Sequence, residues 1–272
     1  MTSSLPPYVV LTKEVGITPL EAIETWKKAH PEYTDVPASY AGRLDPMATG
    51  LLLVLLGDEC KKAKQYQGLD KEYEVEVLLD IETDTGDILG LPTYSNKETS
   101  GDRVSLAITS AKGTHTVPYP FYSSKTIHGK PLFQYALEGT LGTIEIPTHT
   151  ETVYQIHLIK TSLISKGELQ KRIASTLSLA PTSNDPRKVL GADFRQDAIR
   201  DAWDTVFATM PERSFTLAKI RVTCASGTYM RTLANRIACV LDTKGMALSI
   251  HRTRIGKYQT LGPLGFWRRR YR

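Results

Sequence analysis

A single carboxylate, Asp45, stands in a glycine-flanked turn where it could take part in chemistry. Pro46 disfavours helical backbone geometry at Asp45, while Gly42 and Gly50 free the chain on either side. Residues 51–56 are uniformly apolar and too few to cross a bilayer, which is typical of a strand buried on both faces. An acid at the mouth of such a strand suits catalysis. An ordinary Asp-Pro turn is the alternative that the local sequence leaves open.

Two further side chains could act with Asp45. Tyr73 comes two positions after Lys71 and begins an alternating strand pattern, so an aromatic ring with a polar hydroxyl stands at a strand end. Arg231 lies in the first turn of a helix after the turn at Gly227, where the helix dipole slightly disfavours a cation. An arginine placed there usually has a partner, and a carboxylate matches its planar geometry. A surface arginine in an ordinary helix is the alternative.

Helices and strands alternate along the chain and must position these residues. A capping-box motif with proline in the first turn predicts a helix over about 18–29. A second helix is expected from Thr228 to a stop at Gly245. Alternating apolar and polar residues predict strands over 73–79, 153–160 and 215–224.

Two polar stretches, 91–114 and 181–192, are expected to be loops or insertions. Helical patterns flank the second stretch, at about 167–179 and 193–209. Residues 161–212 therefore form a helical excursion between two strands rather than a separate domain. No linker interrupts the chain, so we expect one domain over residues 1–272.

Composition excludes several classes of protein. With 272 residues and 41% hydrophobic content, the chain can bury a full core. No run is long and apolar enough for a membrane span, and no signal peptide is apparent, so we expect a soluble protein of the cytoplasm. Cys60, Cys224 and Cys239 are odd in number and widely spaced, which predicts reduced, mainly core thiols without a disulfide framework or a metal site.

The positive charge is concentrated at the C-terminus. Residues 251–272 hold seven of the 34 Lys and Arg residues and no acid, so the other 250 residues carry a net charge of −2. The segment over about 257–272 is therefore a basic tail, which suits phosphate neutralisation and base stacking but also a solubilising or disordered end. The side chains concerned are Arg268, Arg269, Arg270 and Arg272, interleaved with Trp267 and Tyr271.

Five motifs, in order, resemble those of the TruB family of tRNA pseudouridine synthases. They are GRLDPMATG at 42–50, KEY at 71–73, DTGD at 84–87, GTYMRTL at 227–233 and RTRIG at 252–256. The segment around Ser123 and Lys130, and the N-terminal segment with Lys13, resemble further family motifs. The resemblance implies an α+β pseudouridine synthase fold, with a central mixed, mainly antiparallel sheet flanked by helices and loops.

The resemblance also implies a reaction and three catalytic residues. Asp45 occupies the family's catalytic aspartate position, in a reaction that detaches uracil from ribose, rotates it and rejoins it through carbon. A free aspartate has a pKa near ~3.9, so an ionised carboxylate is available at neutral pH unless burial opposes it. Arg231 would keep it charged and oriented, and Tyr73 would stack on the base and share in proton transfer. The reaction needs no cofactor and no metal.

The expected substrate is the T-arm of tRNA, at the T-loop uridine conventionally numbered 55. The base must be flipped out to reach an acid in a cleft, and the folded loop is recognised mainly by its shape. We expect a monomer that requires no protein partner and binds no membrane. The resemblance places substrate contacts at Lys13, Tyr40, Arg43, Lys71, Lys130, Tyr229, Arg252 and Arg254.

Two departures from the family pattern leave alternatives open. Tyr40 replaces the histidine usual before the catalytic motif, and its ring suits stacking on a displaced base without supplying imidazole chemistry. The chain stops 18 residues after Arg254, so we expect no C-terminal PUA domain. One alternative is an RNA-guided rRNA pseudouridine synthase of the dyskerin type. The other is a non-catalytic tRNA-binding or chaperone module.

Overall fold

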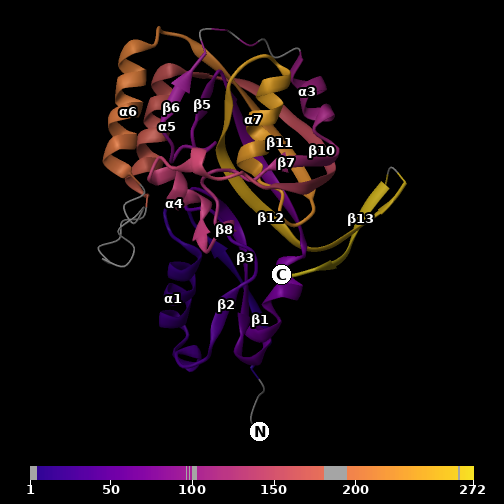
Figure 1. The fold of residues 1–272 in the computed structure, drawn as a ribbon. Helices are drawn as coiled ribbons and strands as arrows, with labels where there is room; N and C mark the ends of the chain where they lie inside the picture. Colours follow the sequence, from indigo (N-terminus) through magenta and orange to yellow (C-terminus); the bar gives the residue numbers. More distant parts are fainter. Residues whose placement is uncertain (1–4, 96, 98, 100–102, 181–194, 263) are drawn as a thin grey trace.

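A nine-stranded sheet forms the centre of the molecule (Figure 1). The computed structural model describes residues 5–95, 97, 99, 103–180, 195–262 and 264–272. Only the pairing of β3 with β12 is parallel among the described strands of this sheet, which confirms the predicted mixed, mainly antiparallel sheet of an α+β fold. Seven strands lie in the order β1 (Tyr8–Lys13), β3 (Thr49–Leu56), β12 (Gly245–Leu261), β4 (Asp70–Leu79), β11 (Ser214–Cys224), β10 (Thr148–Ser165) and β7 (Gly113–Pro118). The other two strands of the sheet are β2 (Ala38–Tyr40), which pairs with β3, and β13 (Leu264–Arg270), which pairs with β12.

Helices pack on the sheet and on its connecting loops. The described helices are α1 (Pro19–Ala29), α2 (Ala63–Gln67), α3 (Val104–Ser110), α4 (Leu132–Leu137), α5 (Lys166–Ser178), α6 (Gln196–Thr209) and α7 (Met230–Val240), with 3-10 turns η1 (Pro31–Tyr33), η2 (Gly57–Lys62) and η4 (Leu141–Thr143). Two small hairpins complete the fold, β5 (Ile81–Thr83) with β6 (Pro92–Tyr94) and β8 (Thr126–Ile127) with β9 (Lys130–Pro131).

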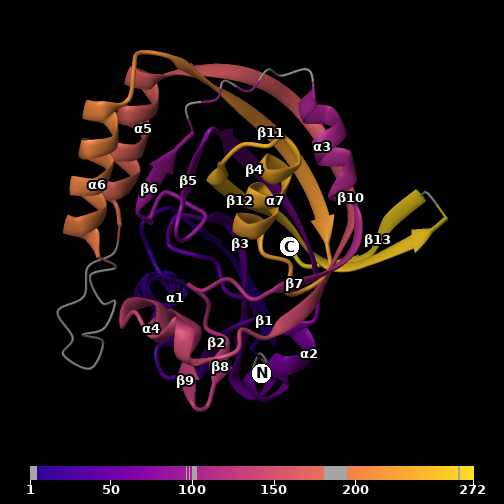
Figure 2. The ribbon, with the colours of Figure 1, turned by 45° about the horizontal axis from the view of Figure 1, so that its top comes forward.

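The alternation of strand side chains sorts the core onto the two faces of the sheet. Val75 and Val77 of β4 belong to the cluster that α3 and α7 cover, together with Leu44 and Met47 of the Asp45 loop. Leu78 of β4 belongs instead to the cluster that α5 and α6 cover. Figure 2 shows α5 and α6 lying together, away from α3 and α7. The helices of the excursion over residues 161–212, α5 and α6, therefore cover one face of the sheet.

The first predicted helix is confirmed at its N-terminus. Thr18 is the N-cap of α1, and its hydroxyl accepts a hydrogen bond from the Glu21 backbone N–H at 3.2 Å. The Glu21 carboxylate in turn accepts from the Thr18 N–H at 2.6 Å, which completes the capping box.

The end predicted for the second helix is wrong. Helix α7 ends at Val240, and Gly245 begins β12 instead of terminating the helix. The chain reverses at Asp242, which has a φ of +56°. A Cβ at position 245 would lie 2.4 Å from the Cβ of Ala238, so the glycine allows the strand to pass close against α7.

The prediction for residues 91–114 needs correction, whereas the strand predicted over 153–160 is confirmed within a longer strand. The stretch 91–114 is not a loop throughout, because it contains β6 and α3, whose Val104 and Ile108 are buried. The strand predicted over 153–160 is part of β10, which extends from Thr148 to Ser165. The predicted loop at 181–192 lies outside the described residues.

The basic C-terminal segment and the cysteines also differ from expectation. Residues 257–261 and 264–270 are not an irregular tail, since they form a hairpin from the end of β12 and from β13. Of the three free cysteines, only Cys224 is a core thiol, because Cys60 is partly exposed and Cys239 is exposed. No helix among the described residues is long and apolar enough to cross a membrane.

Candidate active site

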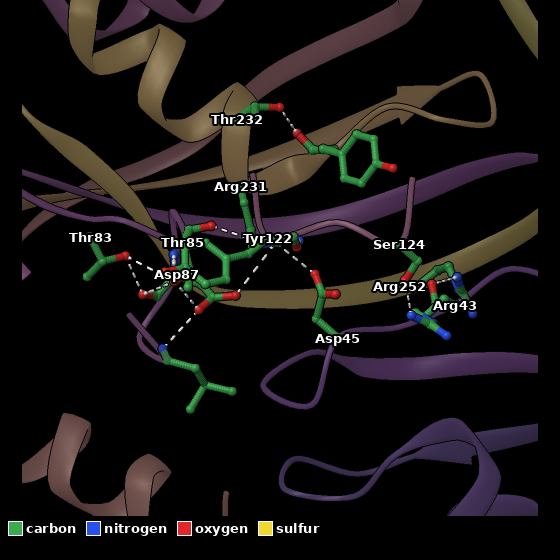
Figure 3. Close-up of polar contacts among 12 residues, drawn as sticks. Arg43, Asp45, Thr83, Thr85, Asp87, Tyr122, Ser124, Arg231, Thr232 and Arg252 are labelled. Atoms are coloured by element: carbon green, nitrogen blue, oxygen red, sulfur yellow. Dashed lines mark hydrogen bonds and ion pairs between the residues drawn. The ribbon is translucent and has the colours of Figure 1, made fainter. Parts of the chain in front are cut away.

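An ion pair between Asp45 and Arg231 forms the centre of the site (Figure 3). The Nε of Arg231 donates to Oδ2 of Asp45 at 2.9 Å, and its other nitrogens donate to the carbonyl oxygens of Thr85 at 2.7 Å and Tyr122 at 3.1 Å. The guanidinium is buried, whereas the Asp45 side chain is 34% exposed. The predicted carboxylate partner of Arg231 is therefore present, and part of that carboxylate stays open to a ligand.

A second carboxylate, Asp87, lies behind the pair and was absent from the predicted site. Its Oδ2 is 3.6 Å from Nε of Arg231, while its Oδ1 accepts from the Thr85 hydroxyl and the Leu89 N–H, both at 2.9 Å. Burial raises the pKa of Asp87 to about 6, and the Arg231 guanidinium opposes that rise. The signal was available in the sequence, because Asp87 closes the DTGD motif ahead of an apolar pair.

Two buried cations hold the loop that carries Asp45. Lys13 donates from Nζ to the carbonyl oxygens of Ala48 at 2.7 Å and Pro46 at 3.2 Å, and burial lowers its pKa to about 8. Arg252 donates from Nε to the carbonyl oxygen of Leu51 at 2.7 Å and from its terminal nitrogens to residues 42 and 43 at 3.3 Å. Both side chains were predicted to contact substrate. Both side chains are fully enclosed and hold the Asp45 loop, and their contact with substrate stays a prediction.

Glycine is required where this loop enters β3. Gly50 has a φ of +102°, and a Cβ there would lie 2.3 Å from the carbonyl oxygen of Arg252. The contact arises because β3 and β12 pair in parallel at this point, with Gly50 opposite Arg252. The backbone that follows Asp45 is thereby held against the strand that supplies Arg252.

Lys71 and Tyr73 lie on β4 beside the loop, and both are buried. The Nζ of Lys71 donates to the carbonyl oxygens of Leu69 and of Gln67, the latter at 2.9 Å, and burial lowers its pKa to about 8. Lys71 therefore supports the backbone here, and its contact with substrate stays a prediction. Burial also raises the pKa of Tyr73, against the influence of the nearby Arg252 guanidinium.

Three predicted residues lie on the partly exposed rim of the site. Arg43 hydrogen-bonds to the Ser124 hydroxyl and donates to the Tyr40 hydroxyl at 3.5 Å. Tyr229, the residue before α7, packs its ring edge-on against His149 at 5.5 Å between centroids. Aromatic rings and one cation thus lie near the open side of Asp45.

The remaining two predicted contacts are engaged elsewhere. Lys130 forms an ion pair with Glu138 and lies over the Tyr135 ring, with 4.5 Å between Nζ and the ring centroid. Arg254 pairs with Glu72 at 3.2 Å. Neither of these contacts is with the Asp45 loop.

The helical excursion reaches the site through Arg195. Its guanidinium makes two hydrogen bonds to the Asp84 carboxylate, at 2.8 and 3.2 Å, and lies 4.5 Å over the Tyr122 ring. The Tyr122 hydroxyl also donates to Asp84, at 3.0 Å. The Tyr122 carbonyl oxygen accepts a hydrogen bond from Arg231. Arg195 therefore connects the helical excursion to a residue that holds Arg231.

The fold and this site together define the class of protein. Two solved structures share the fold. A Cbf5–Nop10–Gar1 complex matches with a TM-score of 0.50 and 17% sequence identity, over 92% of this chain and 48% of that chain. An H/ACA RNP bound to a substrate RNA containing 2′-deoxyuridine matches with a TM-score of 0.50 and 16% sequence identity, over 91% of this chain and 47% of that chain. The model of the TruB family pseudouridylate synthase N-terminal domain matches residues 33–175. This match covers more than half of the sequence, and the chain belongs to the TruB family of pseudouridylate synthases.

Curated relatives carry a more particular name, tRNA pseudouridine synthase B. The protein of that name from Aromatoleum aromaticum is 29% identical over 251 residues, which cover 92% of this chain and 63% of the relative. The one from Francisella tularensis subsp. holarctica is 27% identical over 225 residues, covering 82% of this chain and 57% of the relative. The chain thus spans about three fifths of the length of these relatives.

Proposed function

We propose that this protein is a tRNA pseudouridine synthase that isomerises the T-loop uridine at position 55, with Asp45 as the catalytic carboxylate. The observation that carries the proposal is the half-open ion pair, in which the buried Arg231 holds one oxygen of Asp45 and leaves the side chain 34% exposed. Membership of the TruB family and the names of the relatives support this reaction.

The proposed reaction balances without a co-reactant. The bond between N1 of uracil and C1′ of ribose breaks, the base turns in the site, and a bond forms between C5 and C1′. The C5 proton is released and N1 takes up a proton, so substrate and product have the same composition. Asp45 starts the reaction either by attack on the sugar or by removal of a sugar proton. Arg231 orients it through their 2.9 Å hydrogen bond.

Tyr73 forms the proposed base-binding wall behind Asp45. Because burial raises its pKa, the phenol is neutral at physiological pH and offers a hydrogen-bonding hydroxyl on an apolar ring. A uridine must leave its stack to reach this wall. We expect the enzyme to act as a cytoplasmic monomer that recognises the folded T-arm by shape, without a protein partner.

Tritium release from a tRNA transcript carrying C5-labelled uridine tests the proposal. Wild-type protein should release tritium, and Asp45→Asn should abolish release while tRNA binding stays within about threefold of wild type. Asp58→Asn is the matched control, because Asp58 is an exposed carboxylate paired with the exposed Lys61. Release by Asp45→Asn at the wild-type rate would contradict the assignment.

The same assay separates the two alternative functions. An RNA-guided enzyme would require a guide RNA and protein partners before free tRNA or rRNA fragments were modified. A non-catalytic binding module would bind tRNA and release no tritium at any protein concentration. Turnover on free tRNA by the purified chain alone supports the proposal over both.

A further inference from the structure

The hairpin formed by Lys257–Leu261 of β12 and by β13 projects from the body of the molecule. Figures 1 and 2 both show it extending beyond the sheet, on the side away from α6. In the antiparallel register, Tyr258 lies opposite Trp267 and Lys257 opposite Arg269. The two faces of the hairpin therefore differ, because one carries the aromatic pair and the other carries Lys257 and Arg269.

The aromatic face anchors the hairpin to the sheet. Tyr258 contacts the Trp267 ring at 5.3 Å between centroids and stacks on Tyr154 of β10 at 5.5 Å. Asp70 joins the same group, because its two oxygens accept from the Tyr258 N–H at 2.8 Å and from the Tyr154 hydroxyl at 3.1 Å. The root of the hairpin is thereby fixed in position.

A second anchor follows β13. Tyr271 is 4% exposed, packs against the rings of Tyr8 and Tyr66 at 5.1 and 5.8 Å, and donates its N–H to the Ile255 carbonyl at 3.0 Å. The Arg269 guanidinium lies 4.7 Å over the Tyr271 ring. Because both of its strands are held at the root, the hairpin presents its exposed side chains in one orientation.

The charges on the exposed face repel one another. Lys257 and Arg269 are direct cross-strand neighbours, and like charges in such positions destabilise a hairpin. Arg268 lies at the register shift beside them, and Arg270, opposite Gly256, lies on the other side of the strand; all four side chains are exposed. None of the four has a carboxylate partner within the described part of the chain, and residues 251–272 contain no acid. A polyanion laid along this face would relieve the repulsion.

We propose that the exposed cations of this hairpin, Lys257, Arg268, Arg269 and Arg270, bind the phosphate backbone of the RNA that flanks the target uridine, an inference that rests on the proposed function. RNA fits better than an acidic protein because Phe266, 50% exposed on the same face, offers a ring for base stacking beside the cations. β12 links the arm to the active site, since Arg252 of β12 holds the Asp45 loop. Lys257 lies five positions after Arg252, or ~17 Å of strand, the length of about five stacked nucleotides.

The test is the salt dependence of tRNA binding by Lys257→Ala/Arg268→Ala/Arg270→Ala, which leaves the packing of Arg269 on Tyr271 intact. Each lost phosphate contact should reduce the slope of log K against log salt by about 0.7–0.9, so a decrease of about 2 is expected. KM for tRNA should rise at least tenfold in 0.15 M salt while kcat changes less than twofold.

The matched control removes three exposed lysines from other elements, Lys28→Ala/Lys112→Ala/Lys171→Ala. It lowers the net charge equally and should leave the slope and KM near wild type. If the hairpin variant does not fold, Lys257→Gln and Arg268→Gln singly should each reduce the slope by about 0.7–0.9. An unchanged slope, or an equal decrease in the control, would overturn the proposal.

A protein interface is the competing outcome, because Leu261 and Leu264 at the end of the hairpin are each 71% exposed. A wild-type dimer in solution that Leu264→Ser/Phe266→Ser converts to a monomer, with an unchanged salt slope, would assign the hairpin to self-association and overturn RNA binding. Failure of the proposed function is seen separately, as an absence of tritium release by wild-type protein whose salt slopes remain measurable.

Discussion

Arg231 is buried between two carboxylates, and only one of them is open to solvent. Asp87 is enclosed, at 3.6 Å from the guanidinium, whereas Asp45 is partly exposed at 2.9 Å. A buried guanidinium is costly to desolvate unless its donors are satisfied, and here two backbone carbonyls complete the set. The arrangement gives the two aspartates different roles: Asp87 supports the arginine from behind, and Asp45 faces the ligand.

The raised pKa of Asp87 leads to a prediction about stability. Its pKa rises from 3.8 to about 6 on folding, so between these pH values the folded protein holds a proton that the unfolded chain has released. Stability contributed by this group is complete below pH 4 and falls as pH increases to 6. Relative to Asp87→Asn, the wild type should lose about 3 kcal/mol of unfolding free energy over that range.

Urea denaturation of both proteins at pH 4, 5, 6 and 7 measures this difference. The Asn side chain retains the oxygen that accepts from Thr85 and Leu89, so it is a conservative comparison. If the unfolding free energies of the two proteins differed by the same amount at every pH, folding would leave the pKa of Asp87 unchanged. That result would contradict the rise in its pKa on burial.

At the scale of elements, the site depends on a loop that is held by backbone geometry. Gly50 combines a φ of +102° with a close approach to the Arg252 carbonyl, whereas Gly57 has a φ of +56° and open space around its α-carbon. Gly50→Ala should therefore lower the free energy of unfolding by about 3 kcal/mol or more, and Gly57→Ala by about 1–2 kcal/mol. Urea denaturation measures the unfolding free energy of both variants. An equal loss of unfolding free energy in the two would contradict the dependence of the loop on the β3–β12 contact.

The sequence predicted which residues belong to the site better than what each one does. Asp45 and Arg231 were paired correctly because guanidinium and carboxylate chemistry is local and specific. Lys13, Lys71 and Arg252 were predicted as substrate contacts, and a lysine or arginine in a motif does not reveal that backbone carbonyl oxygens surround it. That distinction depends on the packing of β1, β4 and β12 around the loop, which is a property of the tertiary structure.

At the scale of the whole molecule, periodicity predicted most strands and helices, including α1 and α5. It failed where tertiary contacts decide the structure. Helix α3 was missed because it has only seven residues in a polar stretch, which is too short for a periodic pattern to stand out, and it is stabilised by packing against α7 and β10. The C-terminal hairpin was missed because aromatic contacts from Tyr154, and from Tyr8 and Tyr66, order a segment whose composition alone resembles a tail.

The most direct measurement of the central claim is the position of pseudouridine in a tRNA transcript treated with the purified protein. Isomerisation leaves the mass unchanged, so the product is marked by carbodiimide derivatisation and located by mass spectrometry of nuclease fragments. The account predicts one modified residue, the T-loop uridine, formed by wild-type protein and absent with Asp45→Asn. Derivatised residues elsewhere in the transcript, or no derivatised residue after prolonged incubation with wild-type protein, would contradict it.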